Sequence, residues 1–215
     1  MTIVDAKGQK RNREFIILRR DKPAPEEWNT NKPYCGDQRY YVYFKRPADV
    51  NEMVFMVWKH VALKKNDDRW LYMPSLDLVK RIAATDKRTS FVGSNFFYED
   101  VSGRNTNLDE HSLVDTREKF YVLKSVPKRP EKVGFEYYKT WIHKSSFIPV
   151  KQTYYKKGKD PYREYQVLKV ETIQGYKTVV KSKMTNKESG GHTILEYNDV
   201  AYDVGIPKSI FTERY

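Results

Sequence analysis

The chain has 215 residues, enough for one domain with a sizeable hydrophobic core. Hydrophobic residues make up 39% of it and charged residues 32%, which excludes a mostly disordered chain and a bundle of transmembrane helices. The net charge of +12 favours acidic partners such as nucleic acid, anionic lipid or acidic proteins. Because the basic residues are spread along the whole chain, we interpret them first as a solvated surface.

Aromatic and β-branched residues recur with a period of two from end to end, which predicts a meander of antiparallel strands. The expected strands comprise residues 2–5, 11–20, 38–46, 50–63, 69–73, 78–83, 112–114, 120–126, 135–143, 149–155, 162–171, 176–184 and 192–197. Most connectors in the last third are short and rich in turn-forming residues, so strands that follow one another there are expected to be antiparallel neighbours.

Two segments interrupt this alternation. Residues 21–37 contain three prolines and few apolar residues, which predicts a loop. Cys35 lies in that loop as the single cysteine and is expected to be an unreactive thiol. Residues 84–110 are predicted to form an irregular lid with short helical turns. No internal repeat or domain boundary is evident, so residues 1–215 are expected to form a single domain.

Several expected strands are apolar on both faces, which is unusual for an antiparallel sheet with one wet face. Eleven or so such strands are expected to curl into one strongly curved antiparallel sheet whose concave side is an apolar cavity. The sequence has few helical patterns to cover that side, so we expect the missing layer to be a ligand, a partner or a segment outside this chain. The candidate cavity residues are Tyr41, Tyr43, Val54, Met56, Trp58, Trp70, Tyr72, Phe135, Tyr137 and Trp141.

Motifs for catalysis or cofactor binding are missing from the sequence. The four histidines lack metal-ligand spacing, and no serine lies in a nucleophile elbow. The glycines lack the spacing of phosphate-binding loops. We therefore expect a protein that is not an enzyme and that uses no metal or cofactor.

A series of short motifs in fixed order resembles the outer-membrane lipoprotein-sorting (LolA-like) family of periplasmic proteins. The motifs are Arg46 to Val50, Trp70 to Pro74, Val79 to Ile82, Ser90 to Ser94, Phe97 to Asp100, Ile148 to Val150, Gly205 to Pro207 and Phe211 to Tyr215. The resemblance implies a mainly β (α+β) fold: an unclosed LolA/LolB-like β-barrel with a short helical or loop lid. It also implies a periplasmic carrier that shields the acyl chains of lipoproteins or other lipids, working with an inner-membrane exporter and an outer-membrane acceptor.

The chemistry of one motif suits a lid or cargo gate and equally suits a staple that only fixes a loop, and its candidate residues are Phe91, Gly93, Ser94, Phe96, Phe97, Tyr98, Glu99 and Asp100. Asn95 stands where the family pattern has an acidic residue. Arg81 and Arg88 are candidates for anchoring this loop or meeting a lipid head group. Family members usually carry a signal peptide and a first helix before the strand that begins here at Thr2, and both are expected to be absent from this sequence.

Two other functions remain open from the sequence. Basic residues interleaved with aromatic ones in residues 38–46 and 154–165 suit a protein that binds nucleic acid or another polyanion by base stacking. An apolar groove also suits a periplasmic adaptor that binds a protein segment. We favour the lipid carrier and expect no nucleic-acid partner.

Overall fold

The computed structural model describes residues 1–21, 36–60, 62, 64–158 and 160–212. The predicted loop at 21–37 therefore lies almost entirely outside the described residues, as do Cys35 and the last three residues of the chain. Among the residues that are described, no helix has both the length and the apolar character needed to cross a membrane.

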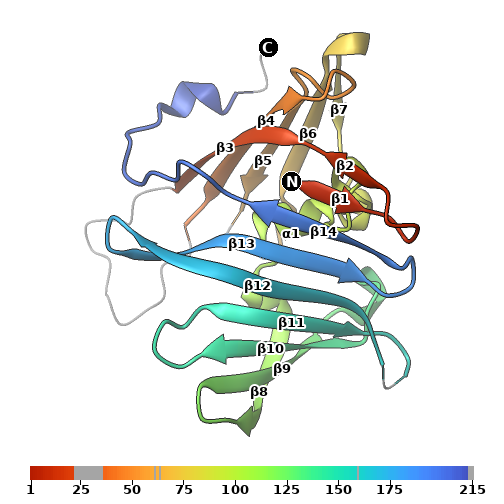
Figure 1. Ribbon diagram of the computed structural model, residues 1–215, viewed down its shortest axis with the longest axis vertical. Coiled ribbons are helices and arrows are strands. Elements are labelled where there is room, and N and C mark those ends of the chain that lie inside the picture. Colours follow the sequence, from red (N-terminus) through yellow and green to blue (C-terminus); the bar gives the residue numbers. More distant parts are fainter. Residues whose placement is uncertain (22–35, 61, 63, 159, 213–215) are drawn as a thin grey trace. The chain divides into compact units, whose positions relative to one another are not determined.

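The fold consists mainly of antiparallel strands, which form two sheets (Figure 1). The larger sheet has nine strands in the order β2-β1-β14-β13-β12-β11-β10-β9-β8, so β2 and β8 are separate edges and the sheet is not closed into a barrel. This confirms the predicted mainly β fold with a large, unclosed antiparallel sheet. The remaining strands form a second sheet, in the order β3-β4-β5-β6-β7, rather than extending the first.

The nine-stranded sheet contains β1 (Thr2–Val4), β2 (Lys10–Asn12), β8 (Asp109–Thr116), β9 (Phe120–Pro127), β10 (Tyr137–His143), β11 (Pro149–Tyr155), β12 (Pro161–Ile173), β13 (Tyr176–Asn186) and β14 (Gly191–Glu196). The long β12–β13 hairpin turns at Gln174 and Gly175, which both have positive φ, as a two-residue turn of this kind requires. Two short 3-10 helices flank strands of this sheet: η4 (Thr106–Leu108) precedes β8, and η5 (Pro130–Lys132) lies between β9 and β10.

The five-stranded sheet contains β3 (Glu14–Asp21), β4 (Gln38–Arg46), β5 (Val54–Lys59), β6 (Asp68–Met73) and β7 (Leu78–Arg81). The segments between β6 and β8 form the 3-10 helices η1 (Pro74–Leu76), η2 (Asp86–Arg88) and η3 (Phe91–Gly93) and the helix α1 (Tyr98–Ser102). A last 3-10 helix, η6 (Lys208–Ile210), precedes the end of the chain. Short helical turns within residues 84–110 match the prediction for this segment.

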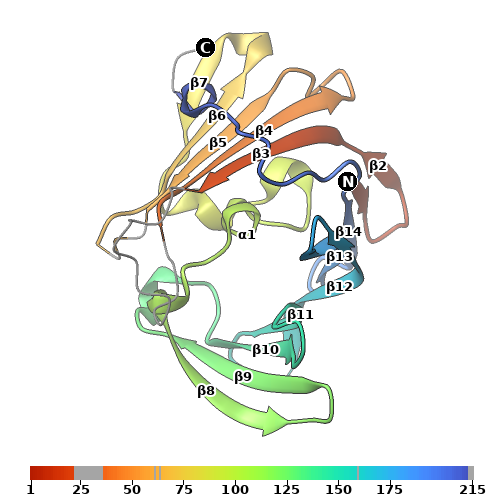
Figure 2. The same cartoon turned by 90° about the vertical axis from the view of Figure 1, so that its left-hand side faces the viewer.

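The chain's own segments cover both faces of the five-stranded sheet (Figure 2). On one face, Tyr98 of α1 packs against Phe55 of β5 with ring centroids 5.0 Å apart. On the other face, Phe211 forms a buried cluster with Met56 and Trp70, which Ile206 and Ile210 extend. The expectation that the apolar strands lack a covering layer from this chain is therefore wrong for this sheet, because helix α1 and the C-terminal segment supply it.

The predicted strand over residues 50–63 is wrong in its first part, because β5 begins only at Val54. Residues 47–53 form the turn between β4 and β5. In it the Val50 N–H donates to the Pro47 carbonyl, and the Glu52 N–H donates to the Phe44 carbonyl. Glu52 has a φ of 63°, which a strand does not contain. At the other end, residues 61 and 63 lie outside the described part of the chain.

The described chain divides into two compact units, each with one sheet. The first unit comprises Met1–Arg11, Ser90–Phe97 and Thr106–Tyr202, and contains the nine-stranded sheet. The second comprises Asn12–Thr89, Tyr98–Asn105 and Asp203–Tyr215, and contains the five-stranded sheet, η6 and α1. The single-domain organisation stays a prediction, and each unit is described by itself below.

Candidate functional site

The first half of the predicted lid motif, residues 90–97, is a tight loop packed on the nine-stranded sheet. Ser90 and Phe97 pair across its base, and the Phe91 N–H donates to the Phe96 carbonyl at 2.8 Å. Gly93 has a φ of +76°, a conformation that a side chain would strain. Phe91 and Phe96 are both buried. The loop therefore has an apolar underside that belongs to the core of this unit.

Asn95 ties this loop to strand β14 through Thr193, which is fully buried. The Asn95 N–H donates to the Thr193 hydroxyl at 2.9 Å, and that hydroxyl donates in turn to the Asn95 side-chain oxygen at 2.8 Å. The two bonds close a small ring between loop and sheet. Asn95, which departs from the family pattern, therefore has a structural role as the residue that fixes the loop.

Arg163 of β12 supports the same loop from below. Its guanidinium donates to the Asn95 carbonyl at 2.9 Å and lies 3.8 Å from the centroid of the Phe97 ring. The side chain is 2% exposed, so the charge is held by these contacts rather than by water. Sequence reasoning missed Arg163. The feature that could have identified it is its position on β12. Arg163 lies two residues before Tyr165, so both side chains point to the same, inward-packing face of the strand.

We expect Thr193→Val to lower the free energy of unfolding by about 1–2 kcal/mol, because it removes the buried hydroxyl that accepts from the Asn95 N–H. Chemical denaturation followed by tryptophan fluorescence measures this. Thr172→Val is the matched control, since Thr172 is exposed on β12 and its loss is expected to cost less than about 0.5 kcal/mol. Equal effects of the two substitutions would contradict the role assigned to Thr193.

The face of the nine-stranded sheet that carries this loop, which we call the loop face, is mostly uncharged. Cross-strand partners point to the same side of a sheet, so one row of this face runs through Thr140, Gln152, Tyr165, Met184 and Thr193. Burial raises the pKa of the Tyr165 phenol. Burial and the neighbouring Tyr165 also raise the pKa of Tyr197 to about 12. Both phenols are therefore neutral at physiological pH.

Towards the β8 edge, the loop face exposes aliphatic side chains. Leu113 of β8 lies directly opposite Leu123 of β9, and Leu113 is 58% exposed. Ile142 of β10 lies on the same side, since it pairs with Tyr121 two residues before Leu123. Leu123 and Ile142 are each half-buried. These residues form an apolar surface beside the phenol-rich part of the sheet.

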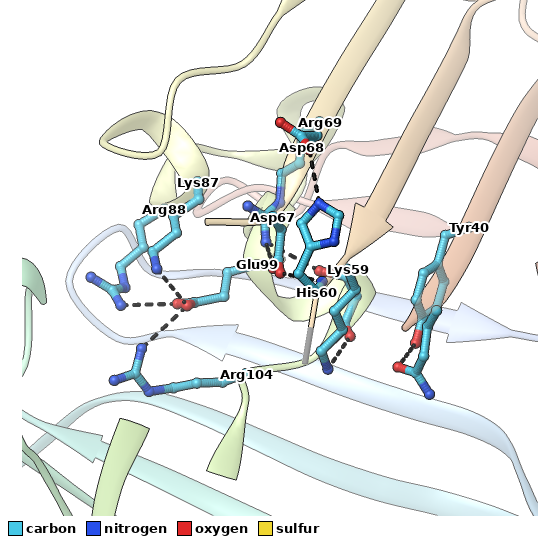
Figure 3. Close-up of polar contacts among 12 residues, drawn as sticks. Tyr40, Lys59, His60, Asp67, Asp68, Arg69, Lys87, Arg88, Glu99 and Arg104 are labelled. Carbon is cyan, nitrogen blue, oxygen red and sulfur yellow. Dashed lines mark hydrogen bonds and ion pairs between the residues drawn. The ribbon is translucent and has the colours of Figure 1, made fainter. Parts of the chain in front are cut away.

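The second half of the lid motif belongs to the other unit, where helix α1 carries Glu99 into a cluster of cations (Figure 3). The Glu99 carboxylate contacts Lys87 at 3.1 Å, Arg88 at 3.0 Å and Arg104 at 3.2 Å. Burial alone would raise the pKa of Glu99, but Arg88, Lys87 and Arg104 outweigh it and lower that pKa. Glu99 is thus held ionised, and it positions α1 beside η2.

Further polar contacts hold α1 and the end of β5 in the five-stranded unit (Figure 3). Lys59 donates to the Ser102 carbonyl at 3.0 Å, so its charge lies at the C-terminal end of α1, and burial lowers its pKa. Arg69, which is buried, donates to Asp67 at 2.7 Å and to the Ser102 hydroxyl. These bonds connect β5 and β6 to helix α1. We therefore assign Lys59 and Arg69 a structural role.

His60 lies between two carboxylates in the same region. Its Nε2 is 2.8 Å from Asp68 and its Nδ1 is 3.4 Å from Asp37. Burial raises the pKa of Asp68, but hydrogen bonds from His60 and Arg81 outweigh this and lower it. Within the described part of the chain, no three His, Cys, Asp or Glu side chains gather in a way that could hold a metal ion.

A model of a family described as an uncharacterized-protein family matches residues 36–215 of the sequence. The chain belongs to this family. No curated protein matches the sequence.

Solved structures of other proteins share the fold of this family member. A DUF1329 family protein from Desulfovibrio piger has a TM-score of 0.84 and 24% identity, over 99% of this chain and 86% of the other. An outer membrane lipoprotein-sorting protein domain from Vibrio parahaemolyticus has a TM-score of 0.82 and 22% identity, over 98% and 85%. A LolA superfamily protein from Nitrosomonas europaea has a TM-score of 0.59 and 18% identity, over 93% and 88%. The LolA-like fold that the sequence motifs imply is confirmed.

The predicted cavity residues of this family member lie on three different surfaces. Seven share the face of the five-stranded sheet that packs against the C-terminal segment, in the cross-strand rows Tyr41–Met56–Trp70 and Tyr43–Val54–Tyr72, with Trp58 beyond them. Phe135 contacts Tyr138 and Tyr154 on the loop face of the nine-stranded sheet. Tyr137 and Trp141 lie on the opposite face of that sheet, because side chains alternate along β10.

The two predicted head-group anchors are both engaged with carboxylates. Arg88 pairs with Glu99, as described above, and is mostly buried. Arg81 pairs with Asp68 at the end of β7, and its side chain is 70% exposed. Of the lid motif, Phe91 to Phe97 fold on one unit, and Tyr98, Glu99 and Asp100 begin α1 in the other. A role for the motif as a gate stays a prediction.

Proposed function

We propose that this protein is a periplasmic carrier of lipoprotein acyl chains or other lipids, and that it performs no covalent catalysis. The observation that carries the proposal is the exposed aliphatic surface formed by Leu113, Leu123 and Ile142 on the loop face of an unclosed sheet. The fold supports it, because it is shared with a protein described as a lipoprotein-sorting domain. An inner-membrane exporter that loads the carrier and an outer-membrane acceptor that receives its cargo complete the proposal.

The chemistry of the loop face suits an acyl chain. Removing a methylene group from water is worth about 0.8 kcal/mol, so even a short contact with aliphatic side chains binds a fatty chain appreciably. The phenols of Tyr165 and Tyr197 are neutral, so they cost little to bring near hydrocarbon. The guanidinium of Arg163 is already held by Asn95 and Phe97. Cargo therefore meets uncharged groups.

A charge placed in this surface tests the proposal. We expect Leu123→Lys to weaken binding of a fluorescent fatty acid such as cis-parinaric acid by about ten-fold or more, because an ammonium group would have to lose water against the chain. Val126→Lys is the matched control: Val126 lies on the same strand, is 40% exposed and points to the opposite face. Wild-type protein that does not bind the fatty acid, or equal losses in both variants, would contradict the proposal.

A further inference from the structure

We propose that the face of the nine-stranded sheet opposite the loop face binds the surface of an anionic phospholipid bilayer. We call it the lysine–aromatic face and define it by Lys124, Tyr137, Lys139, Trp141, Lys151 and Tyr155 on β9, β10 and β11. It lies on the other side of the sheet from the acyl-binding surface proposed above. The inference does not depend on that function, because it concerns different side chains and a different part of the lipid.

The lysines and rings of this face interlock. Tyr137 and Tyr155 are cross-strand partners and stack with centroids 4.5 Å apart. Lys124 lies 4.5 Å from the Tyr137 centroid and Lys139 lies 5.8 Å from that of Tyr155. Lys151 lies 5.4 Å from the Trp141 centroid. The ammonium nitrogens of these lysines thus lie over the aromatic rings.

The register places like charges directly opposite one another. Lys124 on β9 and Lys139 on β10 are cross-strand partners. In the next row, Lys151 pairs with Gln166, which pairs with Lys183. Like charges opposite one another destabilise a sheet. Glu164 contacts Lys151 at 3.1 Å, and Asp115 of β8 interacts electrostatically with Lys139. Lys124, Lys139 and Lys151 outnumber these two carboxylates, so the group stays positively charged. A surface of negative charges spread in two dimensions complements such an arrangement.

The geometry favours a bilayer over a single-stranded nucleic acid. Base stacking requires aromatic faces that are open to an incoming base. Here lysines lie over Tyr137, Tyr155 and Trp141, and the two tyrosines stack on each other. What the face offers is a layer of ammonium groups over amphipathic rings. Tyrosine and tryptophan prefer the level of lipid head groups, and lysines there attract anionic lipid.

Vesicle co-sedimentation tests this proposal directly. We expect the wild-type protein to sediment with vesicles of phosphatidylcholine containing about 30% phosphatidylglycerol, to stay in solution with phosphatidylcholine alone, and to be released as salt rises. Each lysine near such a surface contributes about five-fold, so the triple variant K124Q/K139Q/K151Q is expected to bind about a hundred-fold more weakly. The variant K124R/K139R/K151R keeps the charge and is expected to bind like the wild type.

The control removes the same charge elsewhere. Lys177, Lys187 and Lys208 are exposed, and K177Q/K187Q/K208Q is expected to lose less than about five-fold. Circular dichroism shows whether each variant is folded. Three results would overturn the proposal: no binding of the wild type to anionic vesicles, an equal loss in the control variant, or displacement from the vesicles by oligothymidine at equal charge. Fatty-acid binding measured on the same variants separates this outcome from failure of the carrier function.

Discussion

Replacing Glu99 with Gln is expected to lower the free energy of unfolding by about 3–5 kcal/mol, the range measured when one partner of a buried ion pair is removed. The substitution keeps the shape of the side chain but leaves Lys87, Arg88 and Arg104 close together without the carboxylate between them. Urea denaturation at neutral pH measures the change. Glu52→Gln is the matched control, because Glu52 is an exposed acid in the same unit.

The effect of Glu99 is also expected to depend on pH in a defined direction. The folded protein lowers the pKa of Glu99, so its stabilising contribution is present above the unfolded pKa of about 4.3. It is lost as the pH falls through the lower pKa of the folded state. Wild-type protein and the Glu99→Gln variant should therefore converge in stability in acid. A difference that is the same at every pH, or that grows as the pH falls, would contradict the ionised state assigned to Glu99.

Replacing Arg163 with Met is expected to cost about 3 kcal/mol of unfolding free energy and to loosen the loop at residues 90–97. The substitution removes a charged hydrogen bond to the Asn95 carbonyl and the contact with the Phe97 ring, in a buried place where both are strong. Denaturation measures the stability, and limited proteolysis measures the protection of the loop.

Arg117→Met provides the comparison for Arg163. Arg117 is exposed and pairs only at the surface with Asp115, so its loss is expected to change stability by less than about 0.5 kcal/mol. If the two substitutions had the same effect on stability and on proteolysis, Arg163 would not hold the loop. A loosened loop together with weaker fatty-acid binding would connect the motif to cargo.

Local alternation was a sound guide to the strands. In β4, Tyr40, Val42 and Phe44 are buried and alternate with more exposed neighbours, as the period of two predicts. The alternation rule failed for Phe135, because this residue precedes β10 rather than lying in it. Its side chain therefore does not lie on the same face of the sheet as Tyr137 and Trp141. The same rule overextended β5, because a turn with apolar residues such as Val50 and Met53 has no signature of its own.

Contacts between distant residues were not predictable from the sequence. The packing of Phe211 on Met56 and Trp70 joins residues about 140–155 positions apart in the sequence. No local sequence pattern predicts a contact of this kind. The expectation of an uncovered apolar sheet failed for this reason in the five-stranded unit. Likewise, Asn95 and Thr193 are recognisable as partners only once the loop is seen on β14. The family motifs identified the fold but not these roles.

Native mass spectrometry of the protein purified from cells that produce it naturally, followed by organic extraction, tests the carrier function most directly. We predict that the protein retains lipid or acyl-chain species, that extraction releases them, and that the Leu123→Lys variant retains fewer of them than the Val126→Lys variant. Wild-type protein recovered at the mass of the polypeptide alone, with no lipid in the extract, would contradict the account.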